Sequence, residues 1–256
     1  MPVLPAAVYC MSSTSRSSRT GRVSAGIADT IRHRGCLGSL GYYAKAIFQL
    51  LRDLTPERRR SRYGDIDYDF DHGVDTTWSN VSLGTRLREL ASGAQYQASE
   101  PELFHRILHA LPVQPDEFTF VDLGSGKGRT LLMASDYPFH RIVGIELLAE
   151  LNQIARKNIR AYFSERQRCF KIESSAGDAR DFQFPQESLV LYLFNPFPDY
   201  VLRTVLTNLR RSFQADPREV YIIYHNLVHE DLFLSQSWLK QLHHTHQFAI
   251  YRADDE

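Results

Sequence analysis

A short apolar strand that runs directly into a glycine-rich turn constrains this chain more than any other feature. Residues 119–123 have the composition of a buried strand, and Gly124, Gly126 and Gly128 follow at spacings of two. A helix is predicted immediately afterwards, over residues 129–135. Glycine lets the backbone reach positive φ and approach a ligand closely, and free N–H groups at a helix start favour a negatively charged group. The segment therefore predicts a strand–turn–helix unit that binds a ligand at its turn.

Three classes of ligand site use such a turn, and the neighbouring residues separate them. A phosphate-binding P-loop needs a Gly five residues before the Gly-Lys pair and a Ser or Thr after it, where this chain has Val121 and Gly128. A dinucleotide site has the pattern G-x-G-x-x-G, and Arg129 stands where the last Gly belongs. Sites for S-adenosylmethionine (SAM) carry an acid two residues before the first Gly, and Asp122 is there. The turn therefore favours SAM over a phosphate or NAD.

Apolar segments typical of buried strands alternate with segments of helical periodicity through the rest of the chain. We predict strands at residues 119–123, 141–145, 169–172, 189–194 and 220–224, and helices at residues 100–111, 129–135, 148–163 and 200–213. The fourth strand is continuously apolar, as a parallel strand covered on both faces should be. The alternation predicts a doubly wound α/β fold, with a mostly parallel sheet between two layers of helices.

Polar residues follow the predicted strands. Glu146 closes the second strand, where an acid can accept hydrogen bonds from ribose hydroxyls. Asp178, in a Gly-Asp-Ala turn after the third strand, could present its carboxylate to an adenine amino group, and Asn195 follows the fourth strand. Because ligands of such sheets bind outside the carboxyl ends of the strands, we expect these residues to gather there with Asp122.

The helix at residues 100–111 carries a full set of N-terminal signals. Ser99 is expected as the N-cap, Pro101 lies in the first turn and Glu102 is placed as a capping-box acid. His105 and His109 lie four residues apart on this helix, but no third ligand accompanies them. We therefore predict a polar helix face there, and no metal site in the chain.

The first 94 residues differ in composition from the rest. Residues 1–35 are rich in Ser and Arg, so we expect a disordered tail, although such a start also resembles an organelle transit peptide. Residues 36–94 form a predicted helical cap, and residues 95–256 the ligand-binding domain. Four Asp residues alternate with apolar ones at residues 65–71, but His72 stands where a calcium loop needs its Gly. We predict a solvated strand or loop there.

The charge balance, the apolar runs and the cysteines limit the classes of partner that we expect. Lys plus Arg number 30 and Asp plus Glu number 30, and this neutral balance argues against a dedicated nucleic-acid binder. No run of 18 apolar residues appears, which excludes a membrane-spanning helix and a membrane partner. The three cysteines lie far apart without a C-x-x-C motif, so the expected compartment is a reducing cytoplasm.

Taken together, residues 122–128, Glu146, residues 177–179 and residues 195–197 resemble a class I, Rossmann-like, SAM-dependent methyltransferase. The resemblance covers roughly residues 95–225 and implies a Rossmann-like sheet with an N-terminal helical extension, SAM as the cofactor and methyl transfer as the reaction. It implies that SAM is held by Tyr96, Ser99, Asp122, Gly124, Ser125, Gly126, Glu146, Asp178, Ala179 and Asn195. It also implies that Asn195 lies nearest the transferred methyl group.

Within this superfamily, Tyr96 and Ser99 resemble a segment of the seven-strand, non-SET protein-lysine methyltransferases that precedes the first helix and closes over SAM. Residues 73–76, Gly-Val-Asp-Thr, resemble a stretch of uncharacterised bacterial methyltransferase-like proteins. An amine acceptor, the side chain of a protein lysine, is therefore expected. A small-molecule acceptor and a non-catalytic SAM-binding or scaffold role stay open.

The acceptor side departs from the known amino-methylating pattern. Enzymes acting on adenine or glutamine carry [N/D]-P-P-[Y/F/W] after the fourth strand, and here Phe197 replaces the second Pro and Pro198 the aromatic residue. We expect Asn195 to orient donor and acceptor, and Phe197 and Tyr224 to line the acceptor site. His225 is a possible base, with a structural role favoured. A C-terminal helix at residues 230–242 and one strand at 246–252 predict an incomplete or irregular closing pair of strands.

Overall fold

The computed structural model describes residues 64–77, 81, 82, 84, 85, 98–194 and 197–254. The predictions for the tail at residues 1–35, and for the cap as far as residue 63, lie outside this part of the chain. So do Tyr96 and Asn195.

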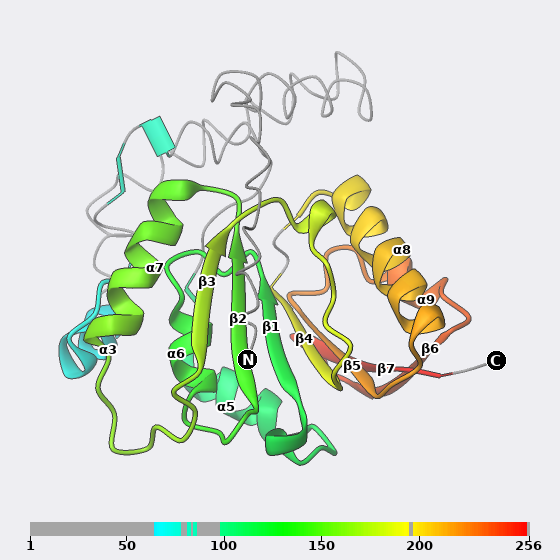
Figure 1. Ribbon diagram of the computed structural model, residues 1–256, viewed down its shortest axis with the longest axis horizontal. Helices are drawn as coiled ribbons and strands as arrows, with labels where there is room; N and C mark the ends of the chain where they lie inside the picture. Colours follow the sequence, from blue (N-terminus) through cyan, green and yellow to red (C-terminus); the bar gives the residue numbers. More distant parts are fainter. Residues whose placement is uncertain (1–63, 78–80, 83, 86–97, 195–196, 255–256) are drawn as a thin grey trace, which may run out of the picture.

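One mixed sheet of seven strands organises the described residues, in the order β3-β2-β1-β4-β5-β7-β6 (Figure 1). The parallel strands are β1 (Thr119–Leu123), β2 (Arg141–Glu146), β3 (Ile172–Ala176), β4 (Leu189–Phe194) and β5 (Val220–His225). The last two strands, β6 (Leu239–His244) and β7 (Phe248–Ala253), run antiparallel to their neighbours. The strand order reverses between β1 and β4, and in open α/β sheets ligands bind at such a switch point.

Alternate residues of the central strands point to opposite faces, where two apolar clusters cover the sheet. One cluster joins β1, β4 and β5 to α8 (Asp199–Ala215), with α9 (Asp231–Leu234) at its end. The other joins the same strands to α5 (Pro101–His109) and α6 (Arg129–Ala134). A further helix, α7 (Ala149–Ala161), packs on β2 and β3 (Figure 1). The predicted doubly wound α/β fold is confirmed.

Two edge strands differ from the prediction. The third strand covers Ile172–Ala176 rather than residues 169–172. Cys169 is buried, but its N–H donates to the carbonyl of Ser135 at 3.0 Å rather than to a neighbouring strand. The predicted C-terminal helix is only Asp231–Leu234, and β6 follows it and pairs with β7. The closing pair is therefore complete, and it is irregular as predicted, since its register shifts between Gln241 and His243. Both β3 and β6 have mostly exposed side chains, so their polar sequences lacked the apolar pattern on which strand prediction depends.

Two predictions for residues that precede β1 in the chain are also wrong. The cap of α5 is Glu100, without a side-chain cap hydrogen bond, because the Ser99 hydroxyl is paired with Tyr192 instead. The Asp-rich residues belong to a helix, α3 (Gly64–His72), rather than to a strand or loop. Tyr68 and His72, four apart, pack against each other on one side of this helix with their ring centroids 4.6 Å apart.

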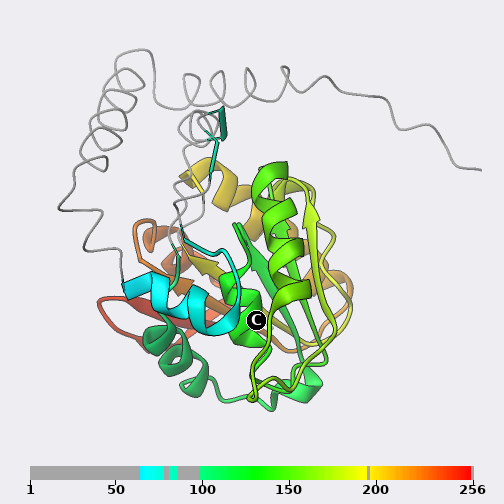
Figure 2. The same cartoon turned by 90° about the vertical axis from the view of Figure 1, so that its left-hand side faces the viewer.

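Helix α3 lies against the Rossmann core, beside the start of α6 and the end of α7 (Figure 2). Its Tyr68 ring lies under the Arg129 guanidinium, and the His72 ring packs at 5.1 Å from that of Tyr162. Within the described part of the chain, none of the helices has both the length and the apolar character needed to cross a membrane.

Candidate functional site

The turn between β1 and α6 has the left-handed backbone that its glycines predict. The φ angles of Gly124, Gly126 and Gly128 are 89°, 54° and 84°. The N–H groups of Gly124 and Ser125 both donate to the carbonyl of Ile145, at 2.8 and 3.1 Å. The turn, called the glycine loop below (residues 124–128), therefore curls over the carboxyl end of β2.

Two buried carboxylates lie beneath the glycine loop. Glu146 at the end of β2 accepts the Gly126 N–H on Oε2 and the Leu148 N–H on Oε1, both at 2.8 Å. Asp122 in β1 accepts a hydrogen bond from the Thr130 hydroxyl. Burial of these acids raises the pKa of each. Burial raises the pKa of Asp122 to about 7. The hydrogen bond from Thr130 opposes this rise, and the charge of Glu146 increases it. The pair suits a ligand that brings hydroxyl donors or positive charge.

A cavity of about 610 Å³ opens at the ends of β2 and β3. It is lined by the two neighbours of Glu146 in the chain, Ile145 and Leu147, but not by Asp122 or the glycine loop. Its lining combines apolar side chains with carboxylates and consists of Ile145, Leu147, Gly177, Asp178, Asp181, Phe182 and Gln183. Asp178 accepts the backbone N–H of Arg180 at 2.9 Å and forms an ion pair with its guanidinium at 2.8 Å. Apolar walls with a few placed polar groups are what a planar heterocycle such as adenine requires. The described residues therefore fit the adenosine part of SAM.

Of the residues that line the cavity, only Asp178 was among the predicted site residues, and Leu147 and Phe182 are the apolar side chains that sequence reasoning missed after the strand ends. Leu147 directly follows Glu146 and has 42% of its surface exposed, which is high for a leucine next to a buried strand. Phe182 lies after the short 3-10 turn η3 (Ala179–Asp181). An apolar residue next to the strand-ending acid was the available signal for Leu147. Ala179, predicted to face adenine, is buried in the α8-side cluster and is not part of the cavity lining.

A hydrogen-bonded chain connects the start of α5 to the ends of β4 and β5. The Tyr192 hydroxyl lies 3.2 Å from the Ser99 hydroxyl and 2.8 Å from Nδ1 of His225. The His225 ring stacks on Phe194, with centroids 4.0 Å apart. Burial lowers the pKa of His225 to about 4, so the ring is uncharged near pH 7 and is a weak base. This environment supports a structural role for His225 rather than proton abstraction.

The remaining predicted residues lie in different surroundings. Phe197 is half-buried against the α8-side cluster. Tyr224 is fully buried, stacks on Phe233 at 4.4 Å and accepts the His229 N–H at 3.0 Å. The buried Ser125 hydroxyl lies over Gly144 and has no hydrogen-bond partner among the described residues. Burial of Tyr224 favours a packing role, whereas the roles of Phe197 and Ser125 stay predictions. Among the described residues, no cluster of His, Cys, Asp and Glu is suited to a metal ion.

The model of one protein family matches part of this chain. Residues 85–193 match the model of a family described as histone methylation protein DOT1. The matched range begins before α5, includes the glycine loop, Glu146 and Asp178, and ends within β4. No curated protein matches the chain.

Solved structures of methyltransferases are also similar to this chain. An RNA methyltransferase from Salinibacter ruber in complex with S-adenosyl-L-homocysteine is 22% identical, with a TM-score of 0.43 over 62% of this chain and 95% of that one. A ribosomal protein L11 methylase from Lactobacillus delbrueckii subsp. bulgaricus is 13% identical, with a TM-score of 0.45 over 64% and 82%. A predicted N6-adenine-specific DNA methylase from Listeria monocytogenes str. 4b F2365 is 16% identical, with a TM-score of 0.46 over 62% and 52%. The expectation that nucleic acid is not a partner stays a prediction, as does the cytoplasmic location.

Proposed function

Since the chain is a class I, Rossmann-like methyltransferase that uses SAM, we propose that its acceptor is an amine, the side chain of a protein lysine. The observation that carries this proposal is the match of residues 85–193 to the DOT1 histone-methylation family. The match includes Ser99 and its segment before α5 as well as the glycine loop. The change from Pro to Phe at residue 197 separates the chain from the pattern of adenine and glutamine methyltransferases.

The cofactor side follows from the geometry of the described acids. In this proposal Asp178 and the cavity walls hold the adenine, and Glu146 accepts hydrogen bonds from the ribose hydroxyls. Asp122 and the glycine loop hold the methionyl part, where a buried carboxylate favours the positively charged end of SAM. Bound SAM supplies an electrophilic methyl group on its sulfonium. The protein then needs to hold the amine in line with that methyl group, an alignment that contributes about 7–11 kcal/mol in favourable systems.

On the acceptor side, Asn195 directly follows β4, and we propose that it orients the amine through its carbonyl oxygen. Phe197 then lines the acceptor site, where an aromatic ring stabilises a cation by about 0.5–2 kcal/mol. An amine attacks only when it is neutral. Because burial lowers the pKa of His225 to about 4, we do not assign this ring as the base. We propose instead that the lysine gives its proton to the bulk buffer before it binds, so that the site takes up the neutral amine.

The test is an assay with methyl-labelled SAM and four separate acceptors: core histones, transfer RNA, duplex DNA and spermidine. We expect label in the histones, recovered as methyl-lysine after acid hydrolysis. The Glu146→Ala variant, which loses a ribose contact, is the control for dependence on SAM. Label confined to RNA, DNA or spermidine would overturn the protein-lysine proposal and identify the acceptor class instead.

The role of Asn195 is tested separately with Asn195→Ala. We expect turnover to fall at least about tenfold while the dissociation constant for SAM, measured by calorimetry, stays unchanged. Unchanged turnover with intact SAM binding would remove Asn195 from the mechanism.

A further inference from the structure

We propose that Asp69 and Asp75, which lie outside the residues matched to the DOT1 family, are positioning residues for the cofactor, because they fix the conformation of the glycine loop. They act through the segment Gly73–Thr77, called the strap below, which lies against the loop. The inference rests on the use of SAM and does not depend on which acceptor is methylated.

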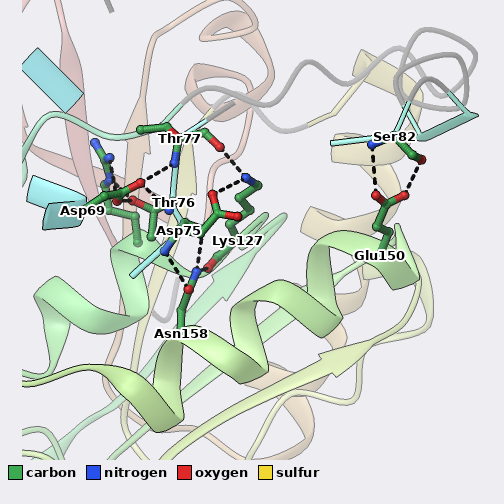
Figure 3. A network of polar contacts seen from close by, with 9 residues as sticks. Asp69, Asp75, Thr76, Thr77, Ser82, Lys127, Glu150 and Asn158 are labelled. Atoms are coloured by element: carbon green, nitrogen blue, oxygen red, sulfur yellow. Dashed lines mark hydrogen bonds and ion pairs between the residues drawn. The ribbon is translucent and has the colours of Figure 1, made fainter. Parts of the chain in front are cut away.

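The first contact joins the strap to the middle of the glycine loop. Lys127 lies between Gly126 and Gly128, yet its side chain has no exposed surface. Its Nζ donates to Oδ1 of Asp75 at 2.7 Å and to the carbonyl oxygen of Thr77 (Figure 3). A lysine in a glycine-rich loop would be placed to meet a phosphate or a nucleic acid, but this one is turned into the protein. A buried ammonium needs such partners, because its desolvation is costly.

The second contact joins the strap to the first residue of α6. Arg129 is 2% exposed, and its Nε donates to the Thr76 hydroxyl at 2.6 Å. Its guanidinium lies 3.4 Å from Oδ1 of Asp69 and 4.8 Å from the centre of the Tyr68 ring. Asp69 in turn accepts the N–H groups of Thr76 and Thr77, at 2.7 and 2.9 Å, on Oδ2. Asp69 thus holds the backbone of the strap through Thr76 and Thr77, and it also forms an ion pair with Arg129.

Asn158 of α7 connects the strap and the loop to each other. Its Oδ1 accepts the Asp75 N–H at 2.9 Å, and its Nδ2 donates to the Asp75 carbonyl at 2.8 Å and to the Lys127 carbonyl at 2.9 Å. Asp75, Lys127 and Asn158 therefore form a closed triangle of hydrogen bonds (Figure 3). The triangle fixes both the backbone and the side chain of Lys127.

These contacts matter for the cofactor because the glycine loop has little rigidity of its own. Glycine has no Cβ to restrict φ and ψ, so three glycines in five residues leave the loop with many accessible conformations. Lys127 is the residue next to Gly126, whose N–H donates to Glu146. A shift of Lys127 therefore displaces the loop from Glu146 and from the edge of the SAM site. We therefore expect the affinity for SAM to depend on Asp75, which lies 52 residues before Lys127 in the sequence and accepts its hydrogen bond.

Calorimetric titration with SAM and with S-adenosylhomocysteine tests the proposal. We expect Asp75→Asn to weaken the binding of both at least about tenfold, which corresponds to about 1.4 kcal/mol. The matched control is Glu187→Gln, which removes a carboxylate from the exposed Arg141–Glu187 ion pair at the other end of the strands. The control is expected to bind both compounds within about twofold of the unmodified chain.

A charge-free double variant, Asp75→Leu with Lys127→Met, separates positioning from stability. Removing both charges leaves no unpaired ion in the interior, so we expect the thermal midpoint without ligand to exceed that of Asp75→Asn. SAM affinity is expected to stay at least about tenfold weaker than in the unmodified chain. If the double variant bound SAM as tightly as the unmodified chain, the pair would serve stability alone and the proposal would fail.

Hydrogen exchange on the unmodified chain tests the same coupling without any substitution. We expect saturating S-adenosylhomocysteine to slow exchange of the Thr76 and Thr77 amides, which donate to Asp69. Equal exchange with and without a bound ligand would overturn the proposal. If the unmodified chain bound neither SAM nor S-adenosylhomocysteine, the methyltransferase premise would fail instead, which is a different result from failure of the strap.

Discussion

At the scale of single residues, the site is defined by acids that the fold buries. Asp122 and Glu146 are 3% and 7% exposed, and burial is the main reason for the raised pKa of each. Both were predicted from their places at strand ends, because a strand end is a local feature of sequence. The raised pKa of each acid was not predictable, since it depends on the residues that the fold packs around the carboxylate.

Asp122 makes the stability of the ligand-free protein depend on pH. Its pKa rises from 3.8 to about 7 on folding, so between these values the folded chain holds a proton that the unfolded chain has lost. This contribution to stability is fully present below pH 3.8 and is lost as pH rises through 7. We expect Asp122→Asn to be more stable than the unmodified chain at pH 8, by up to about 4 kcal/mol, at about 1.4 kcal/mol for each pKa unit.

Urea unfolding at pH 4, 5.5, 7 and 8 measures this effect. The difference in unfolding free energy between Asp122→Asn and the unmodified chain is expected to grow with pH, because only the aspartate ionises. The variant is also expected to bind SAM more weakly, since it lacks the carboxylate. A difference that stayed constant with pH would show that Asp122 does not titrate in this range.

At the scale of elements, β2 and α6 approach each other closely through Gly144. A Cβ on Gly144 would lie 2.5 Å from Cδ1 of Leu131 in α6 and 2.8 Å from the Ser125 hydroxyl. The glycine in β2 is thus required by the helix and by the loop that precede it in the chain. Sequence analysis placed this residue inside a strand without assigning it a role, since the close approach exists only in the folded sheet.

Gly144→Ala is therefore expected to destabilise the protein by about 1–3 kcal/mol through overpacking, and to weaken SAM binding as the glycine loop shifts. Gly84→Ala is the matched control, because its nearest non-adjacent heavy atom would be 4.0 Å from the new Cβ. Thermal unfolding and SAM calorimetry of both variants provide the comparison. Equal stability of the two variants would mean that Leu131 and Ser125 move aside without cost.

At the scale of the whole molecule, the expected boundary at residue 95 divides a set of buried contacts. The prediction treated residues 36–94 as a cap separate from the domain at 95–256. Helix α3 and the strap supply the anionic partners of two buried cations, Lys127 and Arg129. Farther along, Ser82 and Thr85 donate to Glu150 in the first turn of α7. We therefore propose that the domain begins at or before residue 64.

Two fragments test this boundary. A chain of residues 95–256 lacks α3 and the strap, so it loses the ion pairs of Lys127 and Arg129 and the packing of Tyr68 on the core. We expect it to be less stable than a chain of residues 64–256, or to fail to fold. Urea unfolding and circular dichroism of both fragments measure the difference. Equal stability would restore the boundary at residue 95.

By itself, the sequence determined the α/β class, the strand-to-helix turn with its three left-handed glycines, and the acids at the ends of β1 and β2. These features depend on patterns of a few consecutive residues, such as an apolar run followed by glycine. Only the tertiary structure decided the polar edge strands β3 and β6, the pairing of Ser99 with Tyr192, and the strap on the glycine loop. Each of these depends on contacts between residues far apart in the chain. Local propensity contains no information about such contacts, because the partner becomes a neighbour only when the sheet has formed.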